Sequence, residues 1–373
     1  MKKFIFKTAL LLIVSSLFIL PPFLILKYSG ENFKDIKDVI RKNNDFLIGY
    51  AHNENNYGYL KWLSINENKK HKILALGSSR VLQFRKNMFK SSFYNAGYTI
   101  TTIGDFKSFL EDIPNDKYPK YLILGIDQWM FNVNYNSGKV AGRPKYYWSN
   151  NFSKYPNPNI YLSVYKGLFT GKYTVDIINN SSSNKIGLNA LVNNTGFRND
   201  GSMYYGSQIS KLINKDASSV DFKFNDTFSR IKDGNKRFEY SENINELAVD
   251  ELHDLLFFCK KNNINVIGFT PPFANSVYDK MISSNKYLYI NNLEKKLQKV
   301  FNKYDYEFYN YPSGKLLGSN DDQFLDGFHG GEVVYLNILI DMLKKHSILN
   351  EVVEIDKLYN DIKNKKNRFV LYQ

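Results

Sequence analysis

The sequence predicts an α/β protein built on a mostly parallel β-sheet. Short apolar runs alternate with longer segments of helical periodicity, a pattern that implies a sheet covered by helices on both faces, a three-layer α/β/α sandwich. The first of these runs ends in Gly77-Ser78-Ser79-Arg80, and the carboxyl end of a first strand is where such proteins carry nucleophiles or anion sites. Near the far end, Asp326-Gly327-Phe328-His329 precedes the last helical segment.

The individual elements follow from apolar runs bounded by glycine, proline or polar residues. Strands are expected at 72–76, 93–95, 121–125, 265–269 and 306–309. Helices are expected at 81–90, 102–112, 246–261, 285–302 and 332–345, after two short polar helices at 31–42 and 55–66. Asn243 and Glu246 have the spacing of a capping box at the start of the helix at 246–261.

The N-terminus predicts a membrane anchor. Residues 8–26 form a stretch of 19 residues without a charge, close to the roughly 20 that cross a bilayer. Pro21-Pro22 interrupts the run and the residues that follow are a poor cleavage site, so an uncleaved anchor is favoured over a signal peptide. Because Lys2, Lys3 and Lys7 precede the run, the rest of the chain is expected outside the cytoplasmic membrane.

These features predict a domain plan. An anchor at 1–27 and a helical linker at 28–70 lead to an α/β domain at 71–349, and a charged tail follows at 350–373. The segment at about 132–245 is rich in Asn, Ser, Tyr and Lys, and it is too long for a structureless loop. We therefore expect an inserted cap with helical pieces at 160–168 and 174–178.

Composition limits the partners. The net charge of +14 favours an anionic partner, and the extracytoplasmic location makes nucleic acid an unfavourable choice, which leaves surface polymers and lipid headgroups. Cys259 is the single cysteine, so there is no intramolecular disulfide, and its place on an apolar helix face predicts a buried thiol. The five histidines show no metal-ligand spacing, and neither a metal nor a cofactor is expected.

Together these motifs resemble the SGNH, or GDSL-type, hydrolase superfamily, whose flavodoxin-like fold matches the predicted one across roughly residues 70 to 345 without the insertion. Gly77-Ser78-Ser79 stands where the family has Gly-Asp-Ser, Asn95-Ala96-Gly97 fits the second block, and Asp326 and His329 fit the last. The resemblance implies a catalytic triad of Ser79, His329 and Asp326. It also implies an oxyanion hole formed by the backbone N–H groups of Ser79 and Gly97.

The third family block departs from its pattern. Gly-x-Asn-Asp is usual, and this chain reads Gly125-Ile126-Asp127-Gln128. An ionised Asp accepts hydrogen bonds and would repel an oxyanion, whereas the family Asn donates one. Three alternatives remain open: another group supplies the third donor, Asp127 is protonated, or the chain is a weak hydrolase. The residues expected to line the site are Ser78, Arg80, Asn95, Asp127, Gln128 and Arg198.

The anchor, the outward-facing body and the Gly-Ser-Ser block also resemble a narrower group. It contains the D-alanyl transfer protein of teichoic-acid modification and polysaccharide O-acetylation proteins, which usually work with a multipass membrane-bound O-acyltransferase. The resemblance implies a serine acyltransferase or esterase acting on acetyl or D-alanyl groups of a surface glycan or teichoic acid. Two alternatives stay open: a hydrolytic glycan deacetylase, and a non-catalytic partner that binds polymer or acyltransferase.

Each motif also has a structural interpretation. A serine at a strand–helix junction often only caps the helix, and Gly97 can be a simple turn glycine. Asp127 can cap a helix, and the segment 196–202 that carries Arg198 can be a polar turn.

Overall fold

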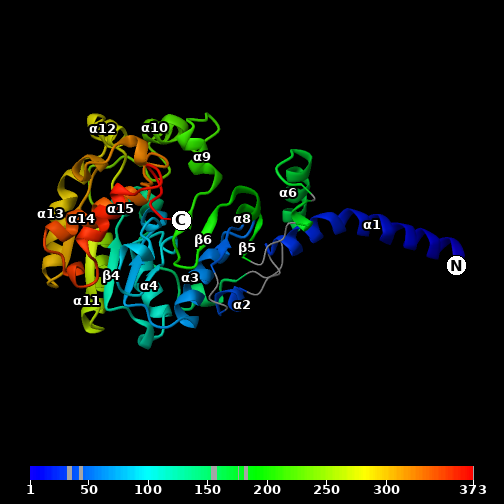
Figure 1. Ribbon diagram of the computed structural model, residues 1–373, viewed down its shortest axis with the longest axis horizontal. Helices are drawn as coiled ribbons and strands as arrows, with labels where there is room; N and C mark the ends of the chain where they lie inside the picture. Colours follow the sequence, from blue (N-terminus) through cyan, green and yellow to red (C-terminus); the bar gives the residue numbers. More distant parts are fainter. Residues whose placement is uncertain (32–35, 42–44, 153–157, 175, 180–183, 373) are drawn as a thin grey trace. The chain divides into compact units, whose positions relative to one another are not determined.

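The computed structural model describes residues 1–31, 36–41, 45–152, 158–174, 176–179 and 184–372 (Figure 1). The chain forms two compact units, and each is described by itself. The anchor unit comprises Met1–Tyr57, Asn151–Asn199 and Met203–Ser207, and the sheet unit comprises Gly58–Asn150, Asp200–Ser202 and Gln208–Gln373. The expected insertion at 132–245 thus contributes residues to both units.

The sheet unit contains a five-stranded sheet in the order β3-β2-β4-β8-β9, with all neighbouring strands parallel. The two central strands β2 and β4 are buried along their whole length, as expected of apolar runs covered on both faces. This confirms the predicted α/β class with a mostly parallel sheet. The strands are β2 Ile73–Leu76, β3 Phe93–Asn95, β4 Tyr121–Gly125, β8 Asn265–Thr270 and β9 Glu307–Asn310.

The helices expected at 55–66, 102–112, 246–261, 285–302 and 332–345 are present in the sheet unit. In α11 the apolar face is buried and Cys259 is inaccessible, so the predicted buried thiol is confirmed. The helices are α3 Asn56–Glu67, α4 Gly104–Asp112, α5 Tyr147–Asn150, α9 Ser207–Ile213, α10 Asn225–Asp233, α11 Glu246–Lys261, α12 Asn275–Ser283, α13 Tyr289–Asn302, α14 Glu332–Lys344 and α15 Ile355–Lys363. Most residues of α3 and α9 belong to the sheet unit, and the first residues of both belong to the anchor unit.

The prediction of a helix at 81–90 is wrong. Two 3₁₀ turns, at Ser79–Val81 and Lys86–Met88, occupy the segment instead. The Asn95 side chain explains the difference, because its Nδ2 donates to the carbonyl oxygens of Val81 at 2.8 Å and Phe84 at 3.0 Å. An α-helix would direct those carbonyls to backbone N–H groups four residues onward.

The prediction of a capping box at Asn243 and Glu246 is also wrong. Asn245 caps α11, and its side chain accepts from the Leu247 N–H at 3.1 Å. Asn243 is held in the preceding turn, where its N–H donates to Ser241 Oγ at 3.1 Å. Helix α12 was not predicted, since no helical periodicity was recognised after Pro271-Pro272.

Glycines let three neighbouring strand ends approach one side chain, Val81. A Cβ atom on Gly77 would lie 2.8 Å from Val81 Cγ1, and one on Gly97 would lie 2.7 Å from Val81 Cγ2. Gly125, at the end of β4, meets the same valine. These positions therefore require glycine for space, at the edge of the sheet where Ser79 begins its 3₁₀ turn.

The anchor unit begins with α1, Lys2–Ser29, which is long and apolar enough to cross a membrane and contains Pro21 and Pro22. A small mixed sheet, β5-β1-β6-β7, was not predicted, because strands of two or three residues carry no recognisable alternation. The remaining elements are α2 Ile36–Arg41, β1 Leu47–Ile48, α6 Pro158–Phe169, α7 Asp176–Asn179, β5 Lys185–Ile186, α8 Leu188–Asn193, β6 Gly196–Arg198 and β7 Met203–Tyr204.

Three predicted helices of this unit can be compared with the described residues. Helix α6 confirms the piece expected at 160–168. Of the helix expected at 31–42, residues 36–41 are helical, whereas 32–35 and 42 lie outside the described residues. Of the piece expected at 174–178, residues 176–178 belong to α7, and residue 175 lies outside the described residues.

The carboxylate of Glu31 joins the end of α1 to two other segments of the anchor unit. Gly30 ends the helix in the left-handed region with φ 73°, a conformation that glycine adopts without strain. Glu31 Oε1 then accepts from the N–H groups of Ala51 and His52, each at 2.7 Å, and Oε2 accepts from that of Leu188 at 2.8 Å. Burial raises the pKa of Glu31 to about 7, although these backbone hydrogen bonds oppose the rise.

Candidate active site

Ser79, His329 and Asp326 meet in the sheet unit although 250 positions separate the serine from the histidine. Ser79 Oγ lies 2.7 Å from His329 Nε2, and His329 Nδ1 lies 2.7 Å from Asp326 Oδ2. The histidine and aspartate side chains are 14% and 15% exposed, so solvent and small reagents can reach them. This is the geometry in which an aspartate orients an imidazole and the imidazole takes a proton from a hydroxyl.

The loop before α14 holds the acid and the base in place. Asp326 Oδ1 accepts from the N–H groups of Phe328 at 2.9 Å and His329 at 2.8 Å, while Leu325 N–H donates to the His329 carbonyl. Burial raises the pKa of Asp326, but the charge of His329 and these hydrogen bonds outweigh it and leave the pKa below its usual value. Asp326 therefore stays an anion that can orient and stabilise an imidazolium.

The predicted oxyanion donors differ in their partners. Gly97 N–H donates to Asn95 Oδ1 at 2.9 Å, while no hydrogen bond from Ser79 N–H is found among the described residues. Asn95, expected to line the site, is fully buried and uses its amide to fix the turns after Ser79. A substrate oxygen must therefore share the Gly97 N–H with the Asn95 side chain.

Ser78 precedes Ser79 and is largely buried. Its Oγ accepts from Arg80 N–H at 3.2 Å, and its carbonyl accepts from Tyr98 N–H at 3.2 Å. Tyr98 adopts φ 77°, a left-handed conformation that is costly for a tyrosine, and it is 40% exposed. Tyr98 was not predicted as a site residue, and its position next to Gly97 was the available signal.

Arg80 lies behind the triad, with its side chain fully buried. Its Nε donates to the Phe328 carbonyl at 2.9 Å and its Nη2 to the Pro271 carbonyl at 2.6 Å. The guanidinium also lies over the rings of Trp129 and Phe273, at 4.9 and 4.5 Å from their centroids. Arg80, which follows Ser79 in the chain, thus holds the backbone of Phe328, the residue before His329.

Asp127 and Gln128 complete the surroundings of Arg80. Nη1 of Arg80 donates to Asp127 Oδ1 at 3.3 Å and to Gln128 Oε1 at 2.9 Å, and Gln128 Nε2 donates to the Pro271 carbonyl. Both side chains are buried, so they support the site from behind. Asp127 is therefore the counter-charge of a buried arginine.

Burial raises the pKa of Asp127, against the opposing effects of the Arg80 charge and the Ser78 hydroxyl. Asp127 Oδ2 has no partner that meets hydrogen-bond geometry among the described residues, so the Ser78 hydroxyl is near the carboxylate without being well aligned. The contact of Asp127 with Arg80 is a direct ion pair between two inaccessible side chains.

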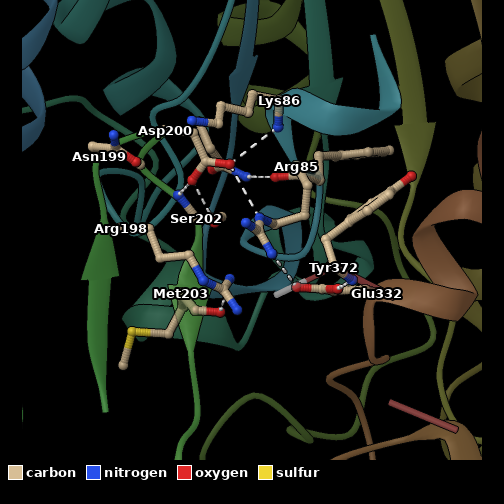
Figure 2. Close-up of polar contacts among 12 residues, drawn as sticks. Arg85, Lys86, Arg198, Asn199, Asp200, Ser202, Met203, Glu332 and Tyr372 are labelled. Atoms are coloured by element: carbon tan, nitrogen blue, oxygen red, sulfur yellow. Dashed lines mark hydrogen bonds and ion pairs between the residues drawn. The ribbon is translucent and has the colours of Figure 1, made fainter. Parts of the chain in front are cut away.

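A second buried network fixes the start of α14, three residues after His329 (Figure 2). Arg85 bridges two carboxylates, with Nε 3.1 Å from Asp200 Oδ2 and Nη1 2.6 Å from Glu332 Oε1. Asp200 also accepts from Ser202, and Glu332 Oε2 accepts from the N–H groups of Leu371 and Tyr372. Burial lowers the pKa of Arg85, and the two carboxylates more than compensate.

Arg198 belongs to the anchor unit. Its Nη1 donates to the Met203 carbonyl at 3.2 Å across the β6–β7 hairpin, and its guanidinium lies 4.7 Å from the Tyr204 ring centroid (Figure 2). These contacts stabilise the hairpin. The expected role of Arg198 in lining the site stays a prediction.

No set of three or more His, Cys, Asp or Glu side chains arranged to hold a metal ion occurs among the described residues. The chain significantly matches no protein-family model, no curated protein and no solved structure with which we compared it. The case for a function therefore rests on the geometry of the site and on the motifs in the sequence.

Proposed function

We propose that the sheet unit transfers or hydrolyses acyl groups through an acyl-serine on Ser79. The observation that carries this proposal is the pair of 2.7 Å contacts that link Asp326, His329 and Ser79 in series. Buried structural histidines commonly make one such contact. Nucleophilic catalysis requires a serine hydroxyl in contact with an imidazole that in turn contacts a carboxylate. It also requires that these groups be partly exposed, as they are here.

In the reaction, His329 Nε2 accepts the proton of Ser79 Oγ as that oxygen attacks the acyl carbonyl carbon. Asp326 accepts a hydrogen bond from His329 Nδ1–H and stabilises the imidazolium. The tetrahedral intermediate collapses as His329 returns the proton to the departing alcohol oxygen, leaving an ester on Ser79. A glycan hydroxyl or water then attacks that ester, again losing its proton to His329, and Ser79 leaves as the alcohol.

The negative oxygen of the intermediate would be stabilised by the backbone N–H groups of Ser79 and Gly97. The Asn95 side chain competes for the second donor, and Asp127 supplies no third one. We therefore expect a slower hydrolase than one with three free donors, since removing a single oxyanion donor typically costs about 10²–10³ in kcat.

The substrate class comes from the resemblance and the charge. We propose acetyl or D-alanyl esters of a bacterial surface glycan or teichoic acid, handled together with a membrane-bound O-acyltransferase. The net charge of +14 suits an anionic polymer, and a membrane anchor at α1 would hold the enzyme at a membrane surface. The matching fold would be a three-layer α/β/α sandwich.

We further propose that α1 stays in the membrane and that the remaining chain is extracytoplasmic. The lysines at positions 2, 3 and 7 support this orientation. Protease added to wall-less intact cells should digest the body. Complete protection in cells whose cytoplasmic markers also stay intact would reverse the orientation.

The chemistry is tested with a fluorophosphonate probe and a small activated ester on the full-length protein in detergent. Ser79 should be the labelled residue, and Ser79→Ala should abolish labelling. His329→Ala should reduce it by about 10⁴-fold or more, with a somewhat smaller loss for Asp326→Ala, because the base remains. Ser163→Ala, at an exposed serine of α6, is the matched control and should label like the wild type.

A non-catalytic role in binding polymer or acyltransferase is the second candidate. The buried Asp127–Arg80 pair favours it, since the family's third oxyanion donor is replaced by a structural ion pair. Ester turnover that is unchanged in Ser79→Ala, or a wild-type protein that never labels, would put this candidate first. A glycan deacetylase instead predicts labelling together with release of free acid and no transfer to an added glycan.

A further inference from the structure

Helix α6 packs along the apolar helix α1 within the anchor unit. The Tyr165 hydroxyl donates to the Phe18 carbonyl, and the two ring centroids are 5.1 Å apart. Behind this contact, Val164 is buried in a cluster with Ile25 and Leu26 of α1. Helix α6 is therefore attached to the part of the chain that is apolar enough to enter a bilayer.

The face of α6 turned away from that cluster carries two large exposed apolar side chains. Leu162 is 64% and Phe169 is 86% exposed, and they lie seven positions apart on one helix face with Tyr165 between them. The Tyr165 and Phe169 rings are stacked at 6.1 Å. On α1, Phe18 is 65% exposed as well, so the apolar surface of α1 continues onto α6.

The position of Phe18 sets the depth of this surface. Phe18 lies eight residues before Leu26, the last residue of the uncharged run, or about 12 Å along a helix. A bilayer's hydrocarbon core is about 30 Å thick. If the run crosses the bilayer, the contact with α6 lies in the half nearest the end of α1, below the headgroups.

We propose that α6 is a second membrane contact, which enters the hydrocarbon layer beside α1 with Leu162, Tyr165 and Phe169 among the acyl chains. Lys166 and Lys172 are exposed on and just after the helix, where their ammonium groups reach lipid phosphates. The Tyr165 hydroxyl donates to the Phe18 carbonyl, so its hydrogen bond is made within the protein and needs no water at this depth. The proposal rests on α1 entering a membrane and is independent of the triad.

The test uses full-length protein in vesicles of phosphatidylcholine and phosphatidylglycerol. Single cysteines at Phe169→Cys and Leu162→Cys carry an environment-sensitive fluorophore, since buried Cys259, whose pKa burial raises to about 12, resists labelling. Leu12→Cys in α1 is the control for insertion, and Val192→Cys, an exposed position on α8, is the control for an aqueous site. Quenching is measured with nitroxide-bearing lipids and with iodide.

The probes at 162 and 169 should be quenched by lipid nitroxides at least several-fold more than the probe at 192, and they should be shielded from iodide. Equal iodide quenching at 162, 169 and 192, with the probe at 12 in lipid, overturns the proposal. Shielding from iodide without lipid quenching also overturns it, in favour of a membrane-protein partner on this face. A probe at 12 that stays in water removes both the anchor and the second contact.

Discussion

Arg80 in the sheet unit and Glu31 in the anchor unit are both buried charged side chains that tie distant segments together, and the two charges are stabilised by different means. In the sheet unit, Arg80 pairs with Asp127 and donates to carbonyls of two loops. In the anchor unit, Glu31 accepts from three backbone N–H groups, and no salt bridge to it is found among the described residues. Only the second arrangement leaves a charge that titrates near neutral pH.

The difference shows what a counter-charge contributes. Burial lowers the pKa of Arg80, but Asp127 opposes the change, and a guanidinium stays protonated at any physiological pH. For Glu31 the backbone dipoles do not balance the loss of water, so its pKa reaches about 7. We therefore expect the sheet unit to respond mainly to loss of a side chain, and the anchor unit to respond to pH.

The largest effect is expected for Arg80→Met. It leaves Asp127 buried without its counter-charge, which should destabilise the sheet unit by about 3–5 kcal/mol. Denaturant unfolding followed by near-UV circular dichroism measures this loss. The double variant Arg80→Met/Asp127→Leu should regain most of the stability and still label poorly at Ser79, because the Phe328 carbonyl has lost its donor. Full labelling of the folded double variant would show that Arg80 is structural only.

A smaller effect is expected from pH in the anchor unit. The folded pKa of Glu31 lies above the ordinary value of 4.5, so the stabilisation is complete below about pH 4.5 and is lost as pH rises through about 7. The change is on the order of 3 kcal/mol. Hydrogen exchange at the amides of Ala51, His52 and Leu188, corrected for intrinsic rates, should speed up between pH 5 and 8.

Glu31→Gln is the control, because it cannot titrate. Burial and the Lys172 charge lower the pKa of His52. Protonation of His52 therefore destabilises the anchor unit as pH falls, which is opposite to the effect of Glu31. The difference between wild type and Glu31→Gln isolates the glutamate. Equal pH profiles for the two proteins would show that the Glu31 carboxyl does not titrate in this range.

The smallest effect is expected for Asp127→Asn. Without its charge the site should hold an oxyanion better, so ester turnover should rise, but by less than about tenfold because Arg80 already offsets the carboxylate. Turnover is compared with that of Asp226→Asn, a change at an exposed carboxylate on α10. A fall in turnover with unchanged folding would show that Asp127 helps the reaction through Arg80.

Local patterns were sufficient for prediction where a contact depends on neighbours in sequence. The buried runs of β2 and β4 and the spacing of apolar residues in α11 were enough to place those elements. Long-range polar contacts overrode local propensity elsewhere. Asn95 binds two carbonyls more than ten positions away and prevents a helix after Ser79, which no local window reveals.

In the candidate site, too, some residues were predicted from local motifs, and the contacts of others depend on distant parts of the chain. Ser79, His329 and Asp326 were found because their motifs resemble those of a family, and the structure brings all three together. The role of Arg80 was missed, because pairing with a residue 47 positions away is visible only once the sheet is assembled. The hairpin contact of Arg198 with Met203 likewise depends on two strands too short to recognise.

The order of residues along the chain has a consequence for biosynthesis. Ser79 is made 250 positions before His329, and Glu332, which fixes the start of α14, takes hydrogen bonds from residues 371 and 372. On the proposed function, a growing chain would carry an unactivated serine until residue 372 has been synthesised and the segment around it has folded against α14. Such a chain would not acylate itself during synthesis, and the proposed nucleophile would become active only after these late contacts have formed.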